Sequence, residues 1–301
     1  MNKKFIIGIL ILIYLVNFPD EILAQKKKNR NKFYSGNELK GNRKESGSFL
    51  SKQGWLGLKL GINLTQAVPE NRYSTFSPIQ PSERNTDKQY ENFNQVGIQA
   101  GIELTYRIKF FAISLQPNFR RQIFSYRNDY LWNDTEIIDN TLELTYYQEQ
   151  YLDYVDLPLT IKIEYPSRTF KPFIELGGYY GWLVDANKRV SVSGVDRASG
   201  SNRYFERESI SVGAKDLYAR FSAGLIGGIG VNYDAGNIRL SLDVKYRYGL
   251  NNIANEENRY RDTRLAGIGD VTDDFTMNNI EINLGILFPM RFLSKDYAAT
   301  D

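Results

Sequence analysis

The feature that most constrains this chain is an alternation of apolar and polar residues that recurs in eight separate segments. In residues 96–109, for example, Val96 and Ile98 alternate with Gly97 and Gln99. A helix would scatter such residues round its surface, whereas a strand places them on two opposite faces. The pattern therefore predicts an all-β protein with eight strands, at residues 55–67, 96–109, 111–123, 151–165, 170–184, 217–233, 238–250 and 277–288.

The connections between these strands alternate between short and long. Tight turns are predicted near residue 110 and at residues 166–169 and 234–237, and long connections at residues 68–94, 127–147, 185–215 and 252–275. Short turns at one end and long loops at the other are typical of barrels in bacterial outer membranes. We therefore expect an eight-stranded antiparallel up-and-down transmembrane β-barrel with four long extracellular loops and short periplasmic turns.

Alternation does not by itself say which face meets lipid, because a soluble barrel would enclose its apolar face round a ligand. The predicted strands are long enough for a tilted membrane crossing, which needs about 9–11 residues. Their aromatic residues also gather at both ends, as two bilayer interfaces would select. One set is Trp55, Tyr106, Phe110, Phe111, Tyr165, Phe170, Tyr233 and Phe288, and the other is Phe124, Tyr126, Tyr151, Trp182, Tyr246 and Tyr248. A soluble periplasmic lipid binder is the alternative.

The polar face of the predicted strands carries both signs of charge in near balance. An eight-stranded barrel has room inside for little more than its own side chains, so opposite charges there can pair. We expect a lumen charge network that plugs the barrel, whereas a narrow diffusion channel would favour one sign. The expected members are Lys59, Glu103, Arg107, Arg120, Asp156, Lys162, Glu164, Glu175, Arg220, Asp243, Lys245, Arg247 and Glu281.

The beginning of the chain has the composition of an export signal, with two lysines before an apolar run from Phe5 to Phe18. An uncleaved anchor helix is the alternative, but the run is short for a bilayer crossing. The polar, basic residues that follow predict disorder, and they could instead tether an acidic partner. The predicted parts are a signal peptide at residues 1–24, a basic disordered periplasmic leader at 25–53, the barrel at 54–290 and a tail at 291–301.

The composition excludes much of the chemistry that enzymes use. The chain contains no cysteine and no histidine, which rules out disulfides, thiolate metal sites and the usual general base of a catalytic triad. Asp270, Asp273 and Asp274 could offer oxygen ligands to calcium, but they lack the glycine-spaced pattern of a calcium loop. We therefore expect no enzymatic activity, no cofactor and no metal ion.

Residues 151–159, Tyr-Leu-Asp-Tyr-Val-Asp-Leu-Pro-Leu, resemble a recurrent strand of the PorT-like outer-membrane β-barrel family of the Bacteroidetes. In that family the strand precedes a basic residue and then a strand with Pro and Gly, here Lys162, Pro172, Gly177 and Gly178. The likeness covers residues 55–288 and includes residues 248–253 and 279–286. It implies an eight-stranded barrel, and the family's namesake belongs to the type IX protein-secretion apparatus. The resemblance supplies no catalytic residues.

Together these features predict a non-enzymatic protein of the bacterial outer membrane that acts by binding a partner. The resemblance implies secretion or envelope assembly as the setting, with other envelope or secretion-system proteins as partners besides outer-membrane lipid. A formal net charge of +3 gives no reason to expect nucleic acid as a partner. The alternatives are a surface adhesin or recognition barrel and a narrow diffusion channel.

Overall fold

A computed structural model describes most of the chain after residue 51. The expected signal peptide, almost all of the leader and the tail from residue 291 onward lie outside the described residues. The same holds for parts of the long connections and for two of the tight turns. The described residues are 52–73, 88–134, 136–137, 140–166, 170–198, 201–235, 238–260 and 271–290.

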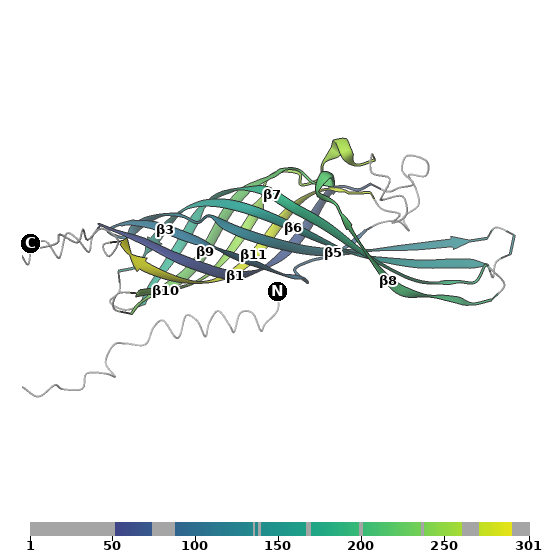
Figure 1. Ribbon diagram of the computed structural model, residues 1–301, viewed down its shortest axis with the longest axis horizontal. Coiled ribbons are helices and arrows are strands. Elements are labelled where there is room, and N and C mark those ends of the chain that lie inside the picture. The colour runs from purple at the N-terminus through teal and green to yellow at the C-terminus, as the bar shows by residue number, and fades with distance from the viewer. Residues whose placement is uncertain are drawn as a thin grey trace, which may run out of the picture. The chain divides into compact units, whose positions relative to one another are not determined.

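All the strands belong to one antiparallel sheet that closes on itself. Hydrogen-bonded pairs lead from β1 to β3, through β4 and β5 to β6, and then through β7, β9, β10 and β11 back to β1 (Figure 1). The described strands are β1 (Lys52–Asn71), β2 (Gln89–Glu91), β3 (Val96–Ile108), β4 (Phe111–Leu115), β5 (Asn118–Asn133), β6 (Thr141–Glu164), β7 (Phe170–Asp196), β8 (Arg203–Gly213), β9 (Phe221–Ala235), β10 (Ile238–Gly249) and β11 (Asp274–Pro289).

The structure thus divides the sheet into eleven strands where the sequence predicts eight. β4 and β5 keep one register against β6, and they are separated at Gln116 and Pro117 because Pro117 has no N–H for the ladder. The backbone N–H of Gln116 donates to the carbonyl of Pro158 across this gap, at 3.0 Å. The other two additions, β2 and β8, lie in connections that were expected to be loops.

The side chains alternate between the two faces of the closed sheet, and the charged ones point inward. In β10, Arg239, Asp243 and Lys245 are buried, whereas Leu240 and Leu242 are exposed at 40% and 48%. Every strand that takes part in the closure has large apolar residues that are exposed. This arrangement is the reverse of a soluble protein, in which such residues form the buried core. Burial therefore places the polar face of the alternating pattern in the lumen.

Two of the expected long loops are largely strand. β5, β6, β7 and β8 run on past the closed part as a projecting sheet (Figure 1), here defined as residues 128–133, 141–147, 187–196 and 203–213. The sequence predicts loops here, because apolar and polar residues alternate in short runs only, such as residues 142–146 and 190–193. Val190 of the projecting sheet is buried, whereas Tyr204 and Ile210 on β8 are exposed.

The lumen changes character along its length, from charged residues to an apolar cluster at the end nearer the projecting sheet. Phe124 and Tyr126, expected in an outer aromatic belt, are buried there, because they fall on the same alternating face of β5 as Arg120 and Gln122. Trp55 at the opposite end is also buried, contrary to expectation. The apolar cluster comprises Ala67, Phe124, Tyr126, Leu152, Tyr154, Leu183, Ala186, Ala214, Leu217, Tyr218, Ile253, Ala254, Phe275 and Met277.

Segments from two long connections meet above this apolar cluster. Lys88, before β2, forms an ion pair of 2.7 Å with Asp273, and Tyr90 donates a hydrogen bond of 2.8 Å to the same carboxylate. Arg259 forms an ion pair with Asp274, and its guanidinium lies over the ring of Tyr73. These contacts cover the mouth of the lumen and occupy Asp273 and Asp274 with protein partners.

The strand β2 is held against β5 by a hydrogen bond as well as by backbone pairing. The Ser125 hydroxyl donates to Glu91 at 2.7 Å. This hydrogen bond holds the pKa of Glu91 below its ordinary value, so the carboxylate stays ionised at neutral pH. The helices of the described residues are short 3-10 turns, and none has the length and apolar character of a membrane-spanning helix.

Candidate functional site

Six charged side chains form a ring across the middle of the lumen, here called the six-charge ring. Lysines and carboxylates alternate round it, and they come from β1, β3, β6, β7 and β10. Its ion pairs include Lys59 with Asp243 at 2.5 Å, Lys59 with Glu103 at 3.1 Å and Lys245 with Glu175 at 3.1 Å. In order the ring is Lys59, Glu103, Lys162, Glu175, Lys245 and Asp243, which returns to Lys59.

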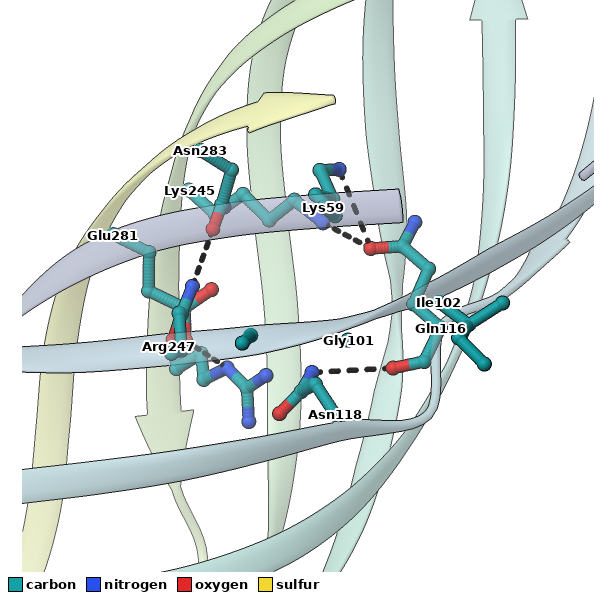
Figure 2. A pocket seen from close by; sticks show the side chains of 11 residues that line it. Lys59, Gly101, Ile102, Gln116, Asn118, Lys245, Arg247, Glu281 and Asn283 are labelled. Atoms are coloured by element: carbon teal, nitrogen blue, oxygen red, sulfur yellow. Dashed lines mark hydrogen bonds and ion pairs between the residues drawn. The ribbon is translucent and has the colours of Figure 1, made fainter. Parts of the chain in front are cut away.

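A single amide, that of Gln116, fills the space inside this ring. Its carbonyl oxygen accepts hydrogen bonds from Lys245 at 2.6 Å and from Lys59 at 3.5 Å. Its amide nitrogen donates to Glu175 at 2.8 Å. Figure 2 shows the side chains of Gln116, Lys59 and Lys245 pointing toward one another. Gln116 lies in the gap between β4 and β5, so the break in the strand places this amide among the charges.

A second ring of four charges, here called the four-charge ring, lies next to the first. Asp156 on β6 pairs with Arg120 at 2.7 Å and with Arg247 at 2.9 Å. Glu281 on β11 completes the ring by pairing with Arg247 and, at 3.9 Å, with Arg120. The ring of Tyr179 faces both guanidiniums, with centroid distances of 5.6 Å and 4.7 Å, an arrangement that stabilises desolvated cations.

A third group of charges lies at the short-turn end. Glu164 accepts from Arg239 at 2.9 Å and lies 3.3 Å from Arg107. Arg239 also pairs with Asp234 at 2.7 Å, and its guanidinium lies 4.2 Å from the ring of Trp55. This stacking explains why Trp55 points inward.

The structure places eleven of the thirteen expected network residues inside the lumen and brings them together in these three groups. Arg107 lies at the rim and is partly exposed. The expectation for Arg220 was wrong. Arg220 is exposed rather than buried in the network, because β9 begins at Phe221 and the predicted strand extended the alternation past its true start.

Sequence reasoning missed two residues of the network. Arg239 is buried at 2% exposure and falls on the same alternating face as Asp243, so the period of two was sufficient to find it. Gln116 carries no formal charge, so the balance of charges that predicts the network does not indicate it. With Arg239 included, the three groups contain six buried cations and six buried carboxylates, namely Lys59, Arg120, Lys162, Arg239, Lys245 and Arg247 with Glu103, Asp156, Glu164, Glu175, Asp243 and Glu281.

The side chains leave little free volume between the two rings. The cavity between the two rings, lined by Lys59, Gln99, Gln116 and Arg247 among others, has a volume of about 20 Å³. A single water needs roughly 10–15 Å³ measured in this way. A hydrated ion entering from either end would therefore have to separate existing ion pairs.

The described residues do not bring together three acidic side chains in a way that could hold a metal ion. The lumen carboxylates already have lysine and arginine partners, and the cations are matched by carboxylates in number. The charges of the three groups are therefore neutralised by one another. It can hold the strands together and fill the lumen.

A closed antiparallel sheet with charges inside and apolar residues outside is the arrangement of membrane β-barrel proteins. Comparison with known families agrees, since residues 27–255 match the family described as outer membrane protein beta-barrel domain. The chain belongs to this family, and it is a protein of the bacterial outer membrane. A comparison with curated proteins gives no match.

Several solved structures are similar to this chain at low identity. Neisserial surface protein A is 13% identical, with 78% of this chain and 96% of that chain covered and a TM-score of 0.30. Ail, the attachment invasion locus protein of Yersinia pestis, solved with the heparin analogue sucrose octasulfate, is 9% identical over 78% and 99%, with a TM-score of 0.30. The N-terminal beta-barrel domain of Pseudomonas aeruginosa OprF is 11% identical over 78% and 100%, with a TM-score of 0.24.

Proposed function

We propose that the protein is a non-enzymatic, non-conducting outer-membrane barrel that binds a protein partner through its projecting sheet. The observation that carries this proposal is that β5 to β8 continue well past the closed part of the sheet. A barrel needs no such extension to be stable in a membrane. The filled lumen argues against transport as the role.

The proposed barrel has eight transmembrane strands. They are β1, β3, β4 together with β5, β6, β7, β9, β10 and β11, while β2 and β8 lie outside the bilayer. The change inside the lumen from charged to apolar residues supports this boundary. Where lipid surrounds the wall the polar residues point inward, and where water surrounds it the apolar residues do so. The long-loop end is then the extracellular end.

The projecting sheet has features suited to binding a polypeptide. β8 pairs with β7 along one edge, and among the described residues its other edge has no partner strand. Tyr204 and Ile210 on this strand are exposed at 72% and 55%. A free strand edge with exposed apolar side chains can accept an additional strand from another chain. The proposed partner is therefore a protein with an extended segment.

The register of the projecting sheet allows it to be removed without opening the barrel. Arg127 pairs with Tyr147, and Asn187 pairs with Gly213. Replacing residues 128–146 and residues 188–212 by two-residue turns would therefore close both hairpins at existing pairs. We expect the truncated protein to reach the outer membrane folded, and to lose the partners that cross-linking and detergent pull-down recover with the intact protein.

A matched control is the replacement of residues 188–212 alone, which removes the β8 edge and keeps the β5–β6 hairpin. Loss of partners in this variant would assign binding to the β8 edge. Retention of all partners in the double truncation would refute the proposed role of the projecting sheet.

The same variants separate the two settings in which such a protein could act. The resemblance to the PorT-like family suggests protein secretion or envelope assembly, in which case the truncation should lower the amount of exported protein in the medium. A surface adhesin would instead lose attachment to its target while export continued. The exposed apolar residues of the projecting sheet are compatible with both.

We propose that residues 1–24 are removed on export, which leaves a basic leader at residues 25–53 ahead of the barrel. The outer-membrane location supports this, because an outer-membrane protein must cross the inner membrane. Mass spectrometry of the mature protein should find Gln25 at its N-terminus. A mature chain that begins at Met1 would contradict the assignment.

A further inference from the structure

A second cavity lies where β7 meets the segment before β9. Its floor is formed by the buried side chains of Leu183 and Tyr218. Asn255 and Asn258 form one wall, and both donate hydrogen bonds to the backbone carbonyl of Asp216, at 3.0 Å and 2.9 Å. The cavity has a volume of about 320 Å³, which is within the size of small-molecule sites.

Two cations line this cavity, Lys215 and Arg220. Both are exposed, and neither side chain has a hydrogen bond or ion pair with any residue that the structure describes. This contrasts with the lumen, where the lysines and arginines are paired with carboxylates. Asp216 is the one carboxylate among the described residues that line the cavity, so these residues carry a net charge of +1.

Leu183 and Arg220, which line the cavity, are followed along the strands by exposed aromatic residues of the apolar exterior, Trp182 and Phe221. Phe221, next to Arg220, is paired across the sheet with Trp182. Tyr180 stacks on Phe221 with a centroid distance of 5.9 Å and meets Trp182 edge-on at 4.7 Å. All three rings are exposed on the apolar exterior, as aromatic side chains at a bilayer interface are.

We propose that this cavity binds the phosphate-bearing headgroup of an outer-leaflet lipid. Arg220 and Lys215 would hold the phosphate, which guanidinium and ammonium groups bind by charge-assisted hydrogen bonds. Asn255 and Asn258 line the part of the cavity that would face the sugar or glycerol portion. The acyl chains would pass over Tyr180, Trp182 and Phe221. The inference rests on the proposed orientation, with the long-loop end outward.

Native mass spectrometry of the detergent-folded protein tests this assignment with lipid A, dephosphorylated lipid A and inorganic phosphate as separate probes. We expect lipid A to remain bound and its dephosphorylated form to be lost. Arg220→Gln and Lys215→Gln should each weaken lipid A binding about tenfold, since each removes one charge-assisted contact. Arg203→Gln, a charge-matched change on exposed β8, should leave the affinity unaltered.

Several results would overturn the proposal. Equal retention of lipid A by Arg220→Gln and by the unaltered protein would exclude the cavity as the site. Equal retention of dephosphorylated lipid A would show that the acyl chains alone are bound, and binding of inorganic phosphate without lipid A would assign the cavity to a free anion. Since the measurement needs no protein partner, its failure is distinct from failure of the projecting sheet to bind one.

Discussion

At the scale of single residues, the lumen shows how a membrane barrel can bury many charges. Each buried cation of the three charge groups lies beside carboxylates from other strands, as Arg247 does between Asp156 and Glu281. Such pairs add little over an apolar filling, because desolvation opposes the Coulomb attraction. Removing one partner is different, because the remaining charge stays buried without compensation.

The four-charge ring provides a direct measurement of this effect. Arg247→Met leaves Asp156 and Glu281 with Arg120 as their one cation, and we expect a loss of about 3–5 kcal/mol in the free energy of unfolding. Urea unfolding of the protein in phospholipid vesicles, followed by tryptophan fluorescence, would measure it. Adding Glu281→Gln restores the balance of charge and should recover most of the loss. Unchanged stability in Arg247→Met would show that the ring does not hold the wall together.

The alternation in the sequence was sufficient to find most lumen residues, because a strand fixes which side chains share a face. It could not show which charges pair, since neighbours such as Lys59 and Asp243 lie far apart in the chain. Arg220 was misplaced because alternation gives no sign of where a strand begins. Residues 215–217 form a 3-10 turn, and the strand starts only after Arg220.

At the scale of the elements, the residue pattern of each part of a strand depends on whether lipid or water lies on its two sides. In the closed part of the sheet, apolar and polar residues of β6 and β7 alternate because lipid lies on one side of the wall. The parts of β6 and β7 that belong to the projecting sheet alternate in short runs only, so the sequence predicts loops there. Tyr, Thr and Val are frequent in these parts, which suits a strand, but this preference depends strongly on context. The fold at membrane depth was thus easier to predict than its extension.

The glycines of β9 make close contacts possible between neighbouring strands. A Cβ atom on Gly224 would lie 2.1 Å from the carbonyl oxygen of Tyr248 and 2.7 Å from the ring of Tyr179. We expect Gly224→Ala to lower the free energy of unfolding by about 1–3 kcal/mol, as overpacking does. The vesicle unfolding assay measures this.

Gly213 on β8 is the matched control for Gly224, because a Cβ there would meet nothing within 4 Å. Gly213→Ala should leave the stability of the barrel unaltered. Equal effects at the two positions would mean that backbone flexibility, rather than the close approach of Tyr179 and Tyr248, is what the glycine provides.

At the scale of the whole molecule, the lumen is filled from the short-turn end to the mouth. Three groups of charges are followed by the apolar cluster, and Lys88 and Asp273 lie above it. The sequence predicted a filled lumen from the balance of charges. It did not predict the apolar cluster, because residues such as Phe124 were assigned to the exterior by their position near a strand end.

The filled lumen predicts that the protein does not conduct ions. Planar-bilayer recordings of the purified protein should show no discrete current steps, because an ion would have to displace Gln116 and its charged neighbours. A general porin reconstituted in the same way provides the positive control. Reproducible steps that disappear when the protein is omitted would refute the filled lumen.

The six-charge ring also bears on how the chain assembles. Lys59 comes from β1 and Asp243 from β10, so the two ends of the sheet must meet before this pair can form. A partly joined sheet in the bilayer would leave ammonium and carboxylate groups facing hydrocarbon, which is strongly unfavourable. Intermediates with an open seam should therefore be sparsely populated, and insertion should proceed as a single concerted event.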